Sequence, residues 1–118
     1  MKHEESNIQT ACVKWFRYQY PELAKLLIAI PNGGFRNQIT AAIMKAEGVV
    51  AGAADLVLFV PKLSDGCGAL CIEMKTPKGT QSELQKEWQK AVEAQGYKYV
   101  LCRSVNEFAD TINEYLYK

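Results

Sequence analysis

Apolar positions follow two different periods along the chain, and the switch between them divides it into successive elements. Four segments repeat apolar residues every three or four positions, as one face of an amphipathic helix does. Four shorter runs are almost entirely apolar and end at Pro, Gly or other turn residues, which predicts buried strands. The helical segments are centred on Ile8–Phe16, Ile39–Ala46, Leu84–Val92 and Val105–Leu116, and the strand-like runs are Leu26–Ile30, Leu56–Val60, Ala69–Met74 and Tyr97–Cys102.

The first helix carries a start signal and a stop signal. Ser6 and Gln9 have the spacing of a capping box, which predicts that the helix begins there. It should end near Tyr20, because Pro21 disfavours helical geometry in the residue before it.

The third helix has two alternative N-caps, and the choice decides what Gln85 does. If Ser82 is the cap, Gln85 completes a capping box and its role is structural. If Thr80 is the cap, with Glu83 as its partner, Gln85 lies one turn inside the helix and is free to face another site. The sequence leaves both alternatives open.

The order of elements predicts an α/β fold, with a mixed central β-sheet flanked by helices. The turn-prone linker Lys62–Gly66 predicts an antiparallel hairpin between the second and third strands. The third helix is a crossover long enough to make the last two strands parallel. A chain of 118 residues is expected to form one domain, residues 1–118.

An acid and a base interrupt the third apolar run. Glu73 and Lys75 are two positions apart, so on a strand both side chains leave the same face. Burying either charge alone would cost several kcal/mol or more, and a partner, a metal or a polar substrate is therefore needed. In a hairpin of this length the start of the second strand lies near the end of the third. Asp55 should then lie close to Glu73 and Lys75.

This combination has a chemical interpretation and a structural one. Two carboxylates close together suit a divalent cation such as Mg²⁺ or Mn²⁺, and a neighbouring lysine can orient an attacking water or stabilise charge on a phosphate. These are the parts of a metal-dependent phosphodiesterase. The structural alternative is that Glu73 and Lys75 form an ordinary ion pair on a solvated sheet face.

Composition narrows the remaining possibilities. Fourteen basic and 13 acidic residues give a net charge of +1, so any positive potential for nucleic acid must be local. The cysteines form no Cys-x-x-Cys, which favours buried thiols over a zinc site. We find neither a signal peptide nor an apolar run long enough for a membrane span, and expect a soluble cytoplasmic protein. The cysteines are Cys12, Cys67, Cys71 and Cys102.

Asp55, Glu73 and Lys75 match the PD-(D/E)xK nuclease signature, and further segments in the same order carry a narrower resemblance. These segments are Glu5–Gln9, Asn32–Gly33, Gly48–Asp55 and Gln85–Trp88. Over nearly its whole length the chain resembles the virus-type replication-repair nuclease (VRR-NUC) branch, in its stand-alone phage or bacterial form. One departure is Ala54, which stands where that family usually has Pro.

The resemblance implies a PD-(D/E)xK, restriction-endonuclease-like core and a Mg²⁺- or Mn²⁺-dependent DNA endonuclease. Asp55 and Glu73 would hold the metal with the backbone carbonyl of Met74. Glu5 would assist directly or through water. Glu4 would replace Glu5 if the register is off by one.

The resemblance also assigns roles around these ligands. Lys75 would position the attacking water, and Gln85 would orient Lys75 or the scissile phosphate. Gly33 lets the backbone approach a phosphate closely and Arg36 can pair with one, although such glycines are more often only a turn. The candidate DNA-binding residues are Asn32, Gly33, Arg36 and Lys78.

Stand-alone relatives of this type resemble junction-resolving enzymes that act as homodimers. We therefore expect branched DNA, such as a Holliday junction, as substrate. The alternatives are a flap or nicking endonuclease, a restriction-type subunit, or a non-catalytic nucleic-acid-binding module. Aromatic residues near helix ends could pack across a two-fold axis or could cover the domain's own core. They are Tyr18, Tyr20, Tyr115 and Tyr117.

Overall fold

The computed structural model describes residues 3–31 and 37–117 and contains one mixed four-stranded sheet in the order β1-β2-β3-β4. β1 pairs antiparallel with β2, β2 pairs antiparallel with β3, and β3 pairs parallel with β4. The predicted hairpin, the parallel crossover and the mixed sheet are therefore confirmed. The strands are β1 (Leu27–Ala29), β2 (Leu56–Leu58), β3 (Leu70–Met74) and β4 (Lys98–Cys102).

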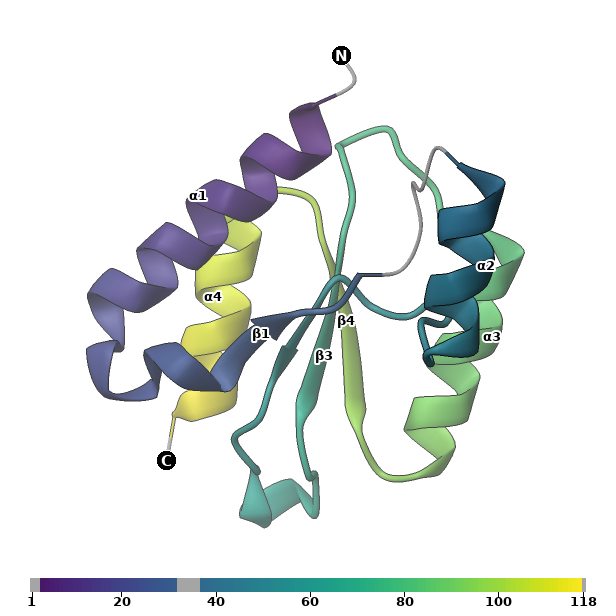
Figure 1. Cartoon of the computed structure of the whole chain (residues 1–118). Coiled ribbons are helices and arrows are strands. Elements are labelled where there is room, and N and C mark those ends of the chain that lie inside the picture. Colours follow the sequence, from purple (N-terminus) through teal and green to yellow (C-terminus); the bar gives the residue numbers. More distant parts are fainter. Residues whose placement is uncertain (1–2, 32–36, 118) are drawn as a thin grey trace.

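Helices cover both faces of this sheet, as the α/β prediction requires. α1 and α4 lie side by side on one face and α3 lies on the other (Figure 1). The α-helices of the described residues are α1 (Glu4–Gln19), α2 (Gln38–Ala46), α3 (Glu83–Ala94) and α4 (Val105–Leu116). Two short 3₁₀ helices cover Pro21–Leu26 and Leu63–Asp65. None of the helices in the described part of the chain is long and apolar enough to cross a membrane.

Alternating residues of β3 contribute to two separate apolar clusters. Ile72 and Met74 are fully buried in the cluster under α1 and α4, with Phe16 and Phe108. Cys71 belongs to the cluster under α3. Because side chains alternate along a strand, Glu73 extends from the same face as Cys71, toward α3.

The first helix starts earlier than its predicted capping box. α1 begins at Glu4, its N-cap His3 makes no side-chain cap, and the Ser6 carbonyl accepts a bond from the Thr10 hydroxyl within the helix. Glu4 and Glu5 in the first turn place negative charge at the positive end of the helix dipole, which favours this start. The prediction of Ser6 as the cap was wrong.

The prediction of a buried first strand was also wrong in part. β1 is an edge strand, and of its residues only Leu27 is buried, while Ile28 is 46% exposed. Pro21 starts a 3₁₀ helix that extends through Leu26 and shortens the strand from its N-terminal end.

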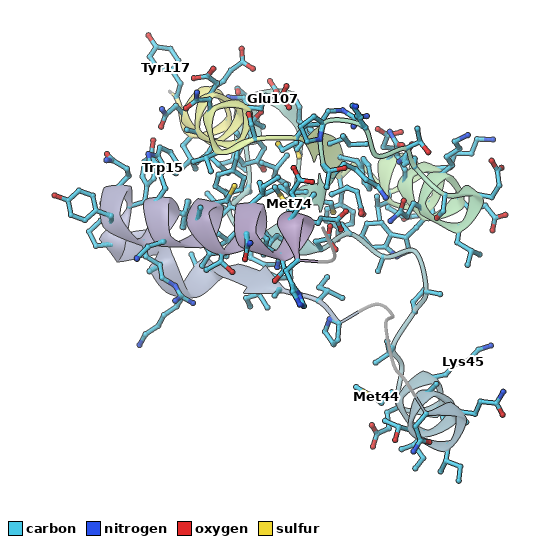
Figure 2. The ribbon with its side chains drawn as sticks, turned by 90° about the horizontal axis from the view of Figure 1, so that it is seen from above. Trp15, Met44, Lys45, Met74, Glu107 and Tyr117 are labelled. Carbon is cyan, nitrogen blue, oxygen red and sulfur yellow. The ribbon has the colours of Figure 1, made fainter. Side chains whose placement is uncertain are left out.

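Two helices leave predicted apolar positions uncovered. On α2, Ile39 is 72% and Ile43 is 53% exposed, and the helix stands apart from the sheet (Figure 2). On α3, Trp88 is partly buried against the sheet, but Leu84 is 52% exposed. The apolar spacing predicted both helices correctly but overestimated how much of each apolar face is buried.

Two of the four tyrosines proposed for a dimer contact are used inside the chain. Tyr115 is 5% exposed and its hydroxyl donates to the Val60 carbonyl at 2.6 Å. The Tyr20 hydroxyl donates to Asn113 Oδ1 at 2.5 Å. Tyr18 and Tyr117 remain exposed.

The segment between α2 and β2 is held against α3 by a close approach at Gly52. A Cβ at this position would lie 2.6 Å from the backbone carbonyl carbon and oxygen of Leu84, and Gly52 has φ +90°. Gly48, at the end of α2, has φ +108°, but a Cβ there would meet nothing within 4 Å. Both glycines need their backbone freedom, but only Gly52 also needs the space.

We predict that Gly52→Ala destabilises the protein by more than Gly48→Ala does. Both substitutions carry backbone strain of about 1–3 kcal/mol. Gly52→Ala adds a collision with immobile backbone, for about 1–3 kcal/mol more. Urea unfolding of the two variants measures the difference. Equal losses of stability would show that α3 moves away at little cost.

Candidate active site

The hairpin brings Asp55 and Glu73 to the same end of the sheet. Leu56 of β2 lies opposite Ile72 of β3, so one step further along the antiparallel register Asp55 faces Glu73. Asp55 Oδ2 accepts a hydrogen bond from the Met74 backbone N–H at 2.7 Å. The predicted juxtaposition of Asp55 with the end of β3 is confirmed.

Glu73 is buried, which excludes the surface ion-pair alternative. It is 1% exposed. Gln85 Nε2 of α3 donates to Glu73 Oε2 at 2.9 Å, and the Tyr99 hydroxyl of β4 donates to Glu73 Oε1 at 3.4 Å. Within the described residues the ion pair of Lys86 with Glu83 at the start of α3 is the only one closer than 4 Å. Glu73 is thus held by neutral donors, without a salt bridge.

The surroundings of Glu73 disfavour its charge. Burial raises the pKa of Glu73 to about 8, and the charge of Asp55, a hydrogen bond with Asp55 and the charge of Glu5 also act to raise it. Lys75 acts in the opposite direction and lowers that pKa. A positive charge beside Asp55 and Glu73 would remove this penalty, since opposite charges favour the ionised carboxylate.

Glu5, rather than Glu4, is the N-terminal acid that reaches this cluster. Burial raises the pKa of Glu5, followed by the charge of Asp55, while Lys75 lowers it. Glu4 is exposed and borders a different hollow of about 570 Å³, which Val105 also lines. The alternative register with Glu4 is therefore not the one in the structure.

The donor set suits a hard divalent cation if water or backbone completes it. Within the described ranges no three acidic, histidine or cysteine side chains lie close enough together to hold one ion. Asp55 and Glu73 supply two carboxylates, and the Met74 carbonyl would be a third oxygen. Mg²⁺ commonly binds one or two carboxylates and keeps several waters, so this set fits. Glu5 would then act through water.

Ser82, not Thr80, is the cap of α3, but Gln85 combines the two roles that the sequence analysis treated as exclusive. Ser82 is the N-cap of α3, and Gln85 Oε1 accepts from the Ser82 backbone N–H at 2.8 Å, completing a capping box. The same side chain donates through Nε2 to Glu73. An amide has an acceptor and a donor end, so one glutamine caps the helix and contacts the buried acid. The structure gives that donor to Glu73 instead of Lys75.

Tyr99 and Gln81 belong to the site, although the sequence analysis did not select them. Burial raises the pKa of Tyr99, which keeps the proton on the hydroxyl that faces Glu73. Gln81 Nε2 donates to that hydroxyl at 3.1 Å and to Gln89 Oε1 at 2.8 Å. The available signal was alternation along β4. It places Tyr99 on the face of Glu73 only when the parallel register, Cys71 opposite Tyr99, is known.

The candidate DNA-binding residues are only partly covered by the structure. Asn32, Gly33 and Arg36 lie outside the described residues. Lys78 is exposed in the turn that follows β3.

We predict that the stability of the protein without divalent cations decreases between about pH 5 and pH 8. The folded Glu73 carboxyl keeps its proton up to about pH 8, whereas the unfolded one loses it near 4.5, so rising pH favours the unfolded state. Glu73→Gln should be less dependent on pH. At pH 8 the free energy of unfolding of Glu73→Gln should exceed that of wild type by at least about 1.4 kcal/mol, which is the energy that corresponds to a shift of one pKa unit.

Denaturant unfolding across this pH range measures the effect. Glu87→Gln changes an exposed acid of α3 and is the matched control. Identical pH profiles for wild type and Glu73→Gln would contradict the raised pKa.

Comparison with known proteins identifies the family and the fold of the chain. The family model described as the VRR-NUC domain matches residues 3–106. A solved structure described as "VRR_NUC domain protein" superposes with a TM-score of 0.81 at 24% sequence identity, over 95% of this chain and 87% of that one. No curated protein matches significantly. The chain belongs to the VRR-NUC domain family and has its nuclease-type α/β fold.

Proposed function

We propose that the protein is a Mg²⁺- or Mn²⁺-dependent DNA endonuclease that hydrolyses phosphodiester bonds. One observation carries this proposal. A buried Glu73 lies opposite Asp55 at the end of a sheet, the charge of Asp55 disfavours the ionised form of Glu73, and Lys75 follows Glu73 by two residues. A purely structural role gives no reason to bury an acid beside a second acid, where its ionised form is disfavoured.

Different residues of the chain would bind the cation, position the attacking water and orient the acids. Asp55 and Glu73 would hold the cation together with the Met74 carbonyl, and Glu5 would assist through water. The cation, when bound, supplies positive charge that offsets the carboxylates and stabilises a phosphate undergoing attack. Lys75 positions the attacking water. Gln85 orients Glu73, to which it donates.

Supporting hydrogen bonds fix the acids before any substrate binds. The Met74 N–H holds one oxygen of Asp55, and Gln85 and Tyr99 each hold one oxygen of Glu73. A carboxylate oxygen accepts more than one bond, so these contacts orient the groups and still leave acceptor capacity for a cation.

We predict that Asp55→Asn and Glu73→Gln each lower cleavage of DNA by several orders of magnitude in Mg²⁺ or Mn²⁺. Each change removes one of two carboxylates that share a cation. Glu5→Gln should have a smaller effect, because its contribution passes through water. Cleavage rates at saturating protein, with melting temperatures alongside, measure the losses.

Glu4→Gln is the matched control for Glu5→Gln, since Glu4 precedes Glu5 in α1 and borders a different hollow. It should cleave like wild type. Near-normal turnover by Glu73→Gln would contradict the proposed metal site. Inactivity of wild type with either metal, combined with tight DNA binding, would favour a non-catalytic binding module.

The proposed substrate is branched DNA, cut by a homodimer in the manner of a Holliday-junction resolvase. A four-way junction offers two equivalent strands, and a C₂ dimer offers two equivalent sites, so a small protomer gains a large recognition surface. Exposed apolar side chains are compatible with such a contact: Tyr18, Ile39 and Ile43 are more than half exposed.

We predict a homodimer at micromolar concentration that cuts four-way junctions at paired, symmetry-related positions in preference to linear duplex. Sedimentation velocity gives the oligomeric state, and a matched panel of four-way, flap, nicked and linear DNA gives the preference. A monomer that cuts flaps and junctions equally would favour the flap endonuclease alternative. Recognition of one linear sequence would favour a restriction-type subunit.

A further inference from the structure

Hydrogen bonds connect the turn that follows β3 to the start of α4, and Lys75 directly precedes that turn. The Lys75 backbone N–H donates to the Cys102 carbonyl at 3.0 Å, extending the β3–β4 pairing beyond the last residue of β3. The chain then turns, and the Gly79 N–H donates back to the Thr76 carbonyl at 3.1 Å. The main chain of Lys75 is therefore fixed, and the turn at Thr76–Gly79 lies directly beside it.

One arginine, directly after the neighbouring strand β4, holds this turn. Arg103 Nη1 donates to the Gly79 carbonyl at 2.6 Å, to the Thr76 carbonyl at 2.8 Å and, more weakly, to the Pro77 carbonyl at 3.4 Å. In the part of the chain that the structure describes, Arg103 forms no ion pair within 4 Å. Its guanidinium is used to hold backbone carbonyls.

Arg103 is itself anchored at the N-terminus of α4. Its backbone N–H donates to Glu107 Oε1 at 2.8 Å, and the Glu107 N–H donates to the N-cap Ser104 Oγ at 3.1 Å. The bonds link α4 to the turn through a short, well-defined path. Because α4 packs on the sheet, the turn cannot shift without breaking bonds to Arg103.

The turn also runs beside the side chain of Lys75. A Cβ built on Gly79 would lie 3.3 Å from Lys75 Cδ and 3.2 Å from Thr76 Oγ1, so the lysine stem lies close against the Gly79 backbone. Gly79 does not have a positive φ. The absence of a side chain at Gly79 thus leaves room for the Lys75 stem and is not required by backbone geometry.

We propose that Arg103 is a positioning residue, which holds the Thr76–Gly79 turn in place so that the room beside Gly79 stays open to the Lys75 stem and the lysine keeps its position for the cleavage step. This inference rests on the proposed nuclease function. The physical reason is that catalysis requires a reactive group at a defined place, and a misplacement of about 1 Å can cost on the order of 100-fold in rate.

A second charged side chain in this protein donates hydrogen bonds to several backbone carbonyls. It suggests a conservative substitution of Arg103 that should keep part of the function. Lys62 Nζ donates to the carbonyls of Glu114, Tyr115 and Tyr117 at the C-terminal end of α4. An ammonium can therefore bridge several backbone carbonyls in this fold. Arg103→Lys should retain part of the contact that Arg103→Ala loses.

The test compares single-turnover cleavage in Mg²⁺ with DNA affinity in Ca²⁺, where binding without cleavage is expected. Arg103→Ala should lower the cleavage rate by about 10- to 100-fold, with DNA affinity unchanged within about two-fold, and Arg103→Lys should recover much of the rate. In a Lys75→Ala background, Arg103→Ala should cause no further loss, because residues that act through one another are not additive.

Gly79→Ala tests the position of the Lys75 stem while leaving Arg103 intact. It can replace Arg103→Ala if that variant does not fold. Its Cβ would displace the flexible Lys75 stem, so the rate should fall while the melting temperature changes little. Gly68→Ala is the matched control: it would press a Cβ against the Tyr97 ring, 3.1 Å away, in the loop that precedes β3. It should cleave like wild type.

Three results would overturn the proposal. A DNA affinity that falls in proportion to the rate would make Arg103 a phosphate anchor. An equal loss from Arg103→Ala with and without Lys75 would show that it acts independently. An unchanged rate for folded Arg103→Ala or for Gly79→Ala would show that the lysine needs no support.

A readout without turnover separates this inference from the proposed function. The NMR signal of the Lys75 ε-methylene group, assigned by its loss in Lys75→Ala, should shift in Arg103→Ala and Gly79→Ala but not in Gly68→Ala. If wild type does not cleave DNA, the proposed function fails, and this shift still reports whether Arg103 positions Lys75. An unmoved signal in folded variants would overturn the positioning itself.

Discussion

The burial of one carboxylate organises this end of the fold. Glu73 lies inside a strand whose residues are all buried, and an acid there is costly unless every neighbour compensates. Three elements contribute: α3 supplies an amide donor from Gln85, β4 supplies the hydroxyl of Tyr99, and the start of β2 brings Asp55. The first two meet the hydrogen-bonding need. Asp55 increases the electrostatic cost of an ionised Glu73, and a positive charge beside the two acids, as the Lys75 charge already shows, lowers that cost.

The donor from α3 shows how local structure and site are connected. Gln85 uses its carbonyl oxygen to cap α3 and its amino group to hold Glu73. A glutamate at this position would also complete a capping box, but its carboxylate has no N–H to donate to Glu73 and would add a third acid beside Asp55 and Glu73. A glutamine is therefore required by two constraints at once. The start of the helix and the orientation of the carboxylate are set by the same side chain.

Local patterns were sufficient for most of the fold and for the central acids. The apolar runs and the turn residues between them predicted the hairpin, and the hairpin placed Asp55 beside Glu73. Sequence could not supply what depends on register or on distant packing. Tyr99 joins the site because of the β3–β4 register. Ile39 and Ile43 have helical spacing, yet spacing does not reveal whether another element covers them, and here α2 stands apart.

The two halves of the candidate site are held by different parts of the structure. The acids depend on the sheet and on the first turn of α3, whereas Lys75 depends on the turn after β3 and, through Arg103, on the first turn of α4. The pleat of β3, continued past Met74 by the bond from the Lys75 N–H to the Cys102 carbonyl, sets the separation of Glu73 from Lys75. What the flanking helices add is orientation of the side chains. Among the described hydrogen bonds, none joins Arg103 to Gln85 or Tyr99, so the contacts that orient the acids and those that hold the turn are separate. The two halves are still coupled through charge, because Lys75 lowers the pKa of Glu73, and a displaced lysine would therefore make Glu73 harder to ionise.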